Sequence, residues 1–203
     1  MYLPKVRELK EAITALIRGP YTHPFPKEPT PVPDNLRAAP RYYEDFCIGC
    51  GACAEVCPAG AITVEDIKTE NKFIRRLTCD YGNCIFCGEC QLNCTTDKGI
   101  QLTPEYELSY FEHSEALEII EHELVICEIC GEVVAPKSQL LHLYEKLGTV
   151  AFSNPTIYLT RMHEFNILPE GSRRDDRKID RWDMVRITCP SCRRDVLLKE
   201  EWG

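Results

Sequence analysis

The sequence contains no long hydrophobic run. None of its 203 residues lies in an apolar stretch close to the roughly 20 residues that a membrane-spanning helix needs. The first 19 residues carry Lys5, Arg7 and Glu8 among other charges, so they lack the apolar centre of an export signal. We therefore expect a cytoplasmic protein with no transmembrane span of its own.

Positive charge is also scarce. The net charge of −8 argues against a nucleic-acid backbone as a partner, because phosphate binding depends on an excess of Lys and Arg. The charge is uneven along the chain. Residues 1–41 contain seven basic and four acidic side chains, a net charge of +3, which leaves −11 for the remaining residues.

A disulfide framework is not expected either, although the sequence has 13 cysteines. Without an export signal the chain stays in a reducing compartment, where thiolates bind metals rather than pair with one another. The five histidines show no spacing typical of a nucleophile and its base, so no catalytic residue is predicted. They are His23, His113, His122, His142 and His163.

The N-terminal 41 residues are predicted to form a helix followed by an extended arm. Apolar residues recur at helical spacing over residues 4–18. Seven of the 14 prolines then fall between Pro20 and Pro40, which excludes both helix and central strand. Two interpretations remain open for this stretch: a flexible linker, or an ordered docking arm that its aromatic residues anchor along a partner subunit.

Residues 45–103 contain an internal repeat. Four cysteines in the first copy are matched by four in the second, each offset by 37 residues. The pairs are Cys47 and Cys84, Cys50 and Cys87, Cys53 and Cys90, and Cys57 and Cys94. A strand-like piece follows each group, at residues 61–64 and 100–103. This duplication predicts an α+β domain of the two-cluster bacterial ferredoxin type over residues 42–104.

The spacing within each copy, C-x2-C-x2-C-x3-C, is typical of iron–sulfur ligands. Three thiolates at i, i+3 and i+6 wrap one cubane, whereas the fourth cysteine has left that loop and ligates the other cluster. The spacing therefore predicts two [4Fe–4S] clusters with crossed ligands. Cluster one is assigned to Cys47, Cys50, Cys53 and Cys94, and cluster two to Cys57, Cys84, Cys87 and Cys90. Zinc bound by the same eight cysteines is the alternative.

Two further features accompany the motifs. Glycines at positions 49, 51 and 88 suit loops whose amides must approach the cluster sulfurs closely. Cys79 lies five residues before Cys84 and has no partner at ligand spacing. We predict that Cys79 is a buried free thiol.

Residues 105–126 are predicted to be an acidic connector. Seven Glu and no Lys or Arg occur in residues 105–123, with apolar residues between them. The pattern indicates a solvated acidic helix or hairpin. A charged outer face exposed to solvent is the leading interpretation, and a binding role is the alternative.

Residues 127–203 are predicted to form a small metal-binding domain. Cys127 and Cys130 form one C-x2-C knuckle, and Cys189 and Cys192 form a second one after 58 intervening residues. Together the four thiolates make a tetrahedral S4 site of the zinc-ribbon or rubredoxin type. Zinc, iron and no metal all remain open for this site, as does the role of residues 150–186.

These features together resemble a known family. The Pro-rich arm, the cysteine motifs and the stretch Leu102–Leu108 that leads to two knuckles resemble the ferredoxin-like iron–sulfur subunit of formate hydrogenlyase and of membrane-bound group 4 [NiFe] hydrogenases. The central part is also similar to the two-cluster subunit of respiratory complex I. The resemblance covers roughly residues 20–130 and 187–198.

The resemblance implies that the eight cysteines of the repeat hold the clusters and that the protein lies in the cytoplasmic arm of a membrane complex. There it relays electrons towards a small subunit that holds one further cluster, with soluble ferredoxin as a candidate electron donor. The terminal acceptor (protons, sulfur compounds or quinone), the direction of electron flow and the cluster potentials remain open.

The leading hypothesis is an electron-transfer subunit of a hydrogenase-like, complex I-related oxidoreductase, peripheral on the cytoplasmic side of the membrane. A free soluble low-potential ferredoxin-type carrier is the main alternative, and a metal-stabilised scaffold is another. The arm and the C-terminal domain weigh against the carrier, because a protein that must dissociate needs neither of them.

Overall fold

The computed structural model describes residues 5–33, 35–69, 72–165, 167 and 181–198. The chain divides into two compact units, Met1–Leu36 and Arg37–Gly203. Within the described ranges, none of the helices combines the length and the apolar content that crossing a bilayer requires. Part of the stretch 150–186, whose role the sequence leaves open, lies outside the described residues.

The first unit contains helix α1 (Val6–Arg18), where the apolar periodicity predicts a helix. The Lys5 backbone N–H donates to the Glu8 carboxylate at 3.0 Å in its first turn. The helix ends where Gly19 takes a left-handed φ of 74°. No residue of α1 is buried. The described residues that follow it in this unit form neither helix nor strand, as the prolines predict.

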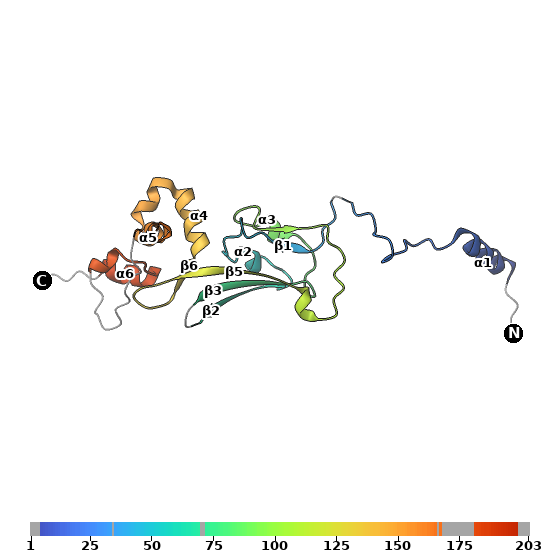
Figure 1. The fold of residues 1–203 in the computed structure, drawn as a ribbon, viewed down its shortest axis with the longest axis horizontal. Coiled ribbons are helices and arrows are strands. Elements are labelled where there is room, and N and C mark those ends of the chain that lie inside the picture. The colour runs from blue at the N-terminus through green and yellow to red at the C-terminus, as the bar shows by residue number, and fades with distance from the viewer. Residues whose placement is uncertain (1–4, 34, 70–71, 166, 168–180, 199–203) are drawn as a thin grey trace. The chain divides into compact units, whose positions relative to one another are not determined.

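The second unit begins with a ferredoxin-like fold. Strands β1 (Pro40–Tyr42) and β4 (Ile100–Leu102) pair antiparallel and join the start of this fold to its end. Between them lie the hairpin of β2 (Ile62–Lys68) and β3 (Phe73–Asp80) and the one-turn helices α2 (Ala52–Glu55) and α3 (Glu89–Leu92). Both short helices lie over the same face of the larger sheet (Figure 1).

The acidic stretch after this fold is largely strand. A 3₁₀-helix (His113–Ala116) leads into β5 (Leu117–Ile126), which pairs with β3 and with β6 (Val133–Pro136) in the order β2-β3-β5-β6. The helical alternative for this stretch is therefore wrong. A strand forms here because the edge of β3 that does not pair with β2 offers backbone groups that β5 can pair with. In a strand, alternate β5 side chains can also pack into the apolar core.

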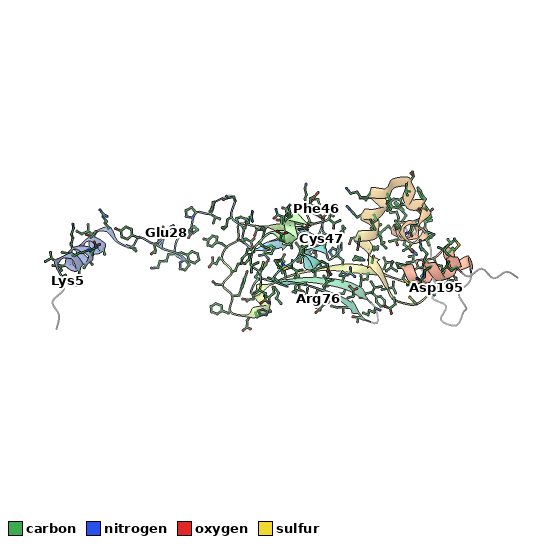
Figure 2. The ribbon with its side chains drawn as sticks, turned by 180° about the vertical axis from the view of Figure 1, so that it is seen from behind. Lys5, Glu28, Phe46, Cys47, Arg76 and Asp195 are labelled. Carbon is green, nitrogen blue, oxygen red and sulfur yellow. The ribbon has the colours of Figure 1, made fainter. Side chains whose placement is uncertain are left out.

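Strand β5 has one face in the core and one in solvent. Ile120 is 4% exposed and lies opposite Leu77 of β3, which is 1% exposed. On the outer face Glu121 accepts hydrogen bonds from Arg76 of β3 at 2.7 and 2.8 Å. Figure 2 shows Arg76 across the sheet from Cys47. The inner side chains of β5 therefore point to the face of the sheet on which the cysteine loops lie.

Helices complete the described part of the second unit. α4 (Lys137–Leu147) follows β6 directly. The region beyond it contains α5 (Pro155–Glu164), and α6 (Pro190–Leu198) follows later. Asn154 caps α5 by accepting the Thr156 N–H at 3.1 Å. Short 3₁₀-helices occur at Gly148–Ser153 and Arg181–Met184.

Candidate cluster cavities and metal site

Two cavities in the ferredoxin-like fold are each lined by four cysteines. The first cavity is lined by Cys47, Cys50, Cys53 and Cys94. The second cavity is lined by Cys57, Cys84, Cys87 and Cys90. In each cavity, three cysteines come from one copy of the repeat and the fourth comes from the other copy.

The one-turn helices explain why the fourth cysteine of each copy leaves its own loop. Gly51 and Gly88 precede α2 and α3 with left-handed φ values of 80° and 85°. Glycine adopts this conformation without the steric cost of a Cβ atom. The chain therefore turns sharply after the second cysteine, and the short helix carries Cys57 or Cys94 away to the other copy.

The two copies share their unusual backbone conformations. Positive φ values occur at three positions of each copy, and the positions are offset by 37 residues. They are Gly49 and Phe86, Gly51 and Gly88, and Gly60 and Asp97. Phe86 and Asp97 have φ values of 54° and 61°, which are strained for residues with a Cβ atom. The repeat thus preserves backbone shape where its side chains differ.

Burial and hydrogen-bond donors act in opposite directions on the thiols of the first cavity. Burial raises the pKa of Cys47 and of Cys53 to about 11, although the Gly49 backbone N–H opposes this at Cys47. At Cys94 burial also raises the pKa, but donors led by the Thr96 hydroxyl outweigh it and lower the pKa below its ordinary value. Donors of this kind stabilise a thiolate ligand.

The donor set of both cavities fits an iron–sulfur cluster. The described residues that line the first cavity include four thiols and no carboxylate, and sulfur is the ligand that such clusters take. The Thr95 hydroxyl lies 3.3 Å from Cys50 Sγ. At the second cavity, the Ala61 N–H donates to Cys57 Sγ at 3.3 Å. Each cavity therefore offers four sulfur ligands and polar groups close to those sulfurs.

Three residues outside the cysteine motifs contact the loop of the first cavity, and sequence analysis did not identify them. Arg75 of β3 donates to the Gly49 carbonyl at 3.4 Å. Ser138, in the first turn of α4, donates to the Ile48 carbonyl at 3.1 Å. His122 of β5 lies next to Ser138. The alternation of inward and outward residues in β5 is the one sequence signal that could have placed His122 on the cluster side.

A further group of cysteines lies where β5, β6 and α6 meet. The sulfur atoms of Cys127, Cys130, Cys189 and Cys192 all lie within 4.8 Å of one another. The Cys130 and Cys189 sulfurs are 3.7 Å apart. An S4 tetrahedron with metal–sulfur bonds of ~2.3 Å has edges of ~3.8 Å. The four thiols therefore fit one tetrahedral metal ion.

The local backbone prepares this site for a metal. Burial raises the pKa of Cys127, but backbone N–H groups of Cys130, Cys189 and Ile129 outweigh it and lower the pKa to about 7. The lowered pKa makes Cys127 the readiest of the four thiols to bind a metal, whereas burial raises the pKa of Cys130 and of Cys192.

The remaining cysteine, Cys79, is fully buried on β3, as predicted. It packs in the core with Leu77 and Ile120. Burial raises the pKa of Cys79 far above its ordinary value, so the thiol stays neutral. Its role is that of a small apolar core residue.

Known proteins are similar to this chain over the cysteine-rich part. Residues 46–98 match the family model described as the 4Fe-4S dicluster domain. The chain is 34% identical over 121 residues to NADH-quinone oxidoreductase subunit I 2 of Geobacter metallireducens, which covers 57% of this chain and 92% of that protein. It is 33% identical over 101 residues to NAD(P)H-quinone oxidoreductase subunit I of Gloeobacter violaceus, which covers 48% of each.

Two other comparisons extend this set. Formate hydrogenlyase subunit 6 of Escherichia coli is 34% identical over 122 residues, which cover 60% of this chain and 66% of that protein. A chain of the membrane-bound sulfane sulfur reductase, an archaeal respiratory membrane complex, aligns with a TM-score of 0.39 and 25% identity over 57% of this chain and 61% of that chain. That structural likeness is too low to carry an argument.

Proposed function

This chain belongs to the family of NADH-quinone oxidoreductase subunit I, and from that premise we propose that it is the electron-transfer subunit of a membrane-associated oxidoreductase complex. It passes single electrons through two [4Fe–4S] clusters and has no catalytic site of its own. The observation that carries this proposal is the pair of cavities, each lined by four cysteines drawn crosswise from the two copies of one repeat.

The proposed ligands follow from the two cavities. Cluster one is held by Cys47, Cys50, Cys53 and Cys94, and cluster two by Cys57, Cys84, Cys87 and Cys90. A bound cluster supplies a site that accepts and releases one electron. The crossed cysteines tie the two copies of the repeat together, which fixes the two sites next to each other in one rigid fold.

The surrounding residues set how readily each site takes an electron. Leu77 and Ile100 line the first cavity, and Ile62 and Leu102 line the second. These apolar side chains exclude water and strengthen the hydrogen bonds that backbone amides make to sulfur. Such hydrogen bonds stabilise the more negative, reduced state, whereas burial in apolar surroundings opposes it.

The family supports our proposal for the place of the protein in a complex. The names of the relatives link them to quinone reduction and to formate hydrogenlyase. This chain lies on the cytoplasmic side of the membrane beside other subunits, among them a small subunit with one further cluster. Soluble ferredoxin is a candidate electron donor. The terminal acceptor is bound by other subunits.

Residues 1–41 dock the protein at or near the membrane face of this complex. Helix α1 leaves Val6, Leu16 and Ile17 at least 80% exposed. The net charge of +3 over this segment suits an anionic membrane surface or an acidic partner. Deletion of residues 2–36 should release the protein from membranes and from its partner subunits while both clusters stay bound. Association at the wild-type level would reduce the segment to a linker.

The group of Cys127, Cys130, Cys189 and Cys192 binds one structural metal ion, and we propose zinc in preference to iron. The site joins the turn between β5 and β6, at Cys127 and Cys130, to the start of α6, at Cys189 and Cys192. Four thiolates close the coordination shell of zinc and leave no position for a substrate. Iron in the same geometry is reducible, so the metal content and its redox behaviour distinguish the two ions.

The cluster assignment is tested on the anaerobically purified full-length chain. It should contain about eight irons in cluster form and give two interacting EPR signals on reduction. Cys94→Ala should damage cluster one and spare cluster two, and Cys57→Ala should do the reverse. Cys130→Ala, which changes a cysteine of the separate group of four at the end of β5, is the control, and both cluster signals should persist in it. Loss of the cluster in the same copy as the changed cysteine would contradict the crossed assignment.

A further inference from the structure

The loop that carries Cys47 and Cys50 is held from outside by β5 and α4. The Ser138 hydroxyl donates to the Ile48 carbonyl at 3.1 Å. Nδ1 of His122 lies 3.2 Å from the same Ser138 oxygen. Both contacts are partly buried, and neither β5 nor α4 belongs to the cysteine repeat. Two elements from outside the ferredoxin-like fold therefore reach one peptide of the cluster-one loop.

The single hydroxyl proton of Ser138 decides the direction of these hydrogen bonds. Ser138 gives its proton to the Ile48 carbonyl, so His122 carries a proton on Nδ1 and donates it to Ser138. Nε2 of His122 is then a bare acceptor, buried and without a hydrogen-bond partner among the described residues. Burial lowers the pKa of His122, which favours this neutral form.

The Ile48 carbonyl belongs to the same peptide group as the Gly49 N–H. That N–H makes a backbone hydrogen bond to Cys47, a proposed ligand of cluster one. A donor on the carbonyl oxygen polarises the peptide and strengthens donation from its N–H. A continuous chain of hydrogen bonds therefore leads from His122 through Ser138 and one peptide group to the Cys47 sulfur.

Packing and a further hydrogen bond hold the two peptide groups that flank Gly49. Gly49 is buried with a φ of 66°, and a Cβ atom there would lie 2.8 Å from the His122 ring. The Gly49 carbonyl accepts from Arg75 at 3.4 Å. Two hydrogen bonds to the Asp66 carboxylate, at 2.7 and 2.9 Å, fix the Arg75 guanidinium in turn. The His122 ring and the donors Ser138 and Arg75 therefore restrict rotation of the peptide groups on both sides of Gly49.

The second copy of the repeat lacks this support. Ile85 and Phe86 occupy the positions that match Ile48 and Gly49. Ile85 is 63% exposed. The Phe86 N–H donates to Cys84 Sγ at 3.4 Å, and Arg37 donates to the Cys87 carbonyl at 3.4 Å. Within the described part of the chain, however, no side chain donates to the Ile85 carbonyl, which matches the Ile48 carbonyl of the first copy. The hydrogen-bond chain from His122 therefore acts on one of the two cavities.

We propose that His122 and Ser138 are positioning residues that raise the reduction potential of cluster one relative to cluster two. The inference rests on the proposed ligands of the two clusters. The hydrogen bond to Cys47 stabilises the more negative reduced state, so weakening it disfavours reduction. Cluster two, which these residues do not reach, serves as the reference inside the same molecule.

The test is an EPR-monitored redox titration of the anaerobic full-length protein. In Ser138→Ala the ratio of reduced to oxidised cluster one at a fixed potential should fall roughly two- to tenfold, the range expected when part or all of one hydrogen bond is lost. Tenfold corresponds to ~59 mV for a one-electron couple. The ratio for cluster two should not change. Ser138→Thr keeps the hydroxyl and should restore the wild-type ratio.

Changes at His122 give an independent measurement. His122→Phe keeps a ring against Gly49 but removes the donor, and it should shift cluster one in the same direction as Ser138→Ala. His122→Asn keeps an N–H near the position of Nδ1 and should lie closer to wild type. Ser153→Ala is the matched control, because that hydroxyl donates only locally, to the Val150 carbonyl at 2.8 Å. It should move neither cluster.

Each outcome decides the proposal. The proposal is overturned if the reduction potential of cluster one is unchanged in both Ser138→Ala and His122→Phe. It is also overturned if the potentials of both clusters shift equally. If Ser138→Ala loses cluster one, the potential measured in His122→Phe decides the proposal, and an unchanged cluster-one potential in that variant overturns it. These outcomes leave the proposed function standing. Wild-type protein without two [4Fe–4S] signals would instead contradict the proposed function and this inference with it.

Discussion

The two copies of the cysteine repeat have similar backbones in different surroundings. The loop of the first copy contains Gly49, which packs against His122 and is held by side chains from three other elements. The loop of the second copy has Phe86 in the same left-handed conformation, and its neighbour Ile85 is largely exposed. The comparison teaches that duplication reproduced the ligand geometry, and that later parts of the chain made the two halves unequal.

This inequality matters for an electron relay. Two sites with the same sulfur ligands and the same surroundings would hold an electron equally well. Differences in hydrogen bonding and burial are the means by which a protein separates their potentials. The strand β5 and the helix α4 reach the first loop alone, so they provide such a difference without changing any ligand.

The largest effect is expected from removing the metal ion that we propose at the end of β5. Replacing Cys189 and Cys192 by Ser should destabilise residues 124–203, because a structural zinc ion contributes on the order of 10 kcal/mol to folding. Limited proteolysis should show this, while both cluster EPR signals persist. A reducible iron that changes state during turnover would contradict the structural role.

The second largest effect is expected from a methyl group at position 49, which should lower the occupancy of cluster one but not of cluster two. Gly49→Ala adds left-handed strain of about 1–2 kcal/mol and a clash with the His122 ring of about 1–3 kcal/mol. We expect a lower occupancy of cluster one, measured by iron content and EPR. Phe86→Gly changes the matched residue and removes strain, so cluster two should stay near its wild-type occupancy. Similar losses in the two variants would mean that the two loops are equally constrained.

A smaller effect is expected on folding stability, where substitutions on the two faces of β5 should have different costs. Glu118 on the inner face accepts hydrogen bonds from Arg41 and Tyr81, and Glu121 on the outer face pairs with exposed Arg76. Glu118→Ala leaves partly buried donors unsatisfied and should cost about 1–3 kcal/mol. Glu121→Ala should cost less than about 1 kcal/mol. Thermal unfolding of the cluster-loaded proteins measures both, and equal shifts would show that the inner face contributes nothing special.

The smallest expected effect is a dependence on pH. Burial lowers the pKa of His122, with Arg75 acting in the same direction and Glu44 against it. The unfolded chain takes up this proton below about pH 6.5, so the stability that neutral His122 contributes is complete above that pH and declines as pH falls towards the folded pKa. The rate at which cluster-one absorbance is lost should therefore rise on mild acidification. His122→Asn should weaken this dependence, and an unaltered dependence would assign it to other groups.

The ferredoxin-like part of the fold was predictable because its signals are local. The spacing of cysteines such as Cys47 and Cys50 reflects the geometry of one loop around one cluster, and the offset of 37 residues reveals the duplication directly. Helix α1 was predictable from apolar periodicity. For α5, the pair Asn154 and Pro155 is a typical helix start.

The contacts that β5 and α4 make with the loop of the first copy were not predictable in the same way. Strand β5 depends on the free edge of β3, which precedes it by almost 40 residues, and its many Glu residues obscure the alternation of inward and outward positions. Arg75, His122 and Ser138 are single polar residues in three separate elements. Only tertiary contacts bring them to the Ile48–Gly49 segment, so no pattern within a short window identifies them.

The order of these elements along the chain also has a consequence for synthesis. The chain emerges from its N-terminal end, so every cavity cysteine, up to Cys94, leaves the ribosome before Leu117 begins β5. The β2–β3 hairpin forms from local contacts, whereas pairing of β3 with β5 closes a longer loop and comes later. The nascent chain therefore presents the Ile48–Gly49 peptide before β5 and α4 can contact it.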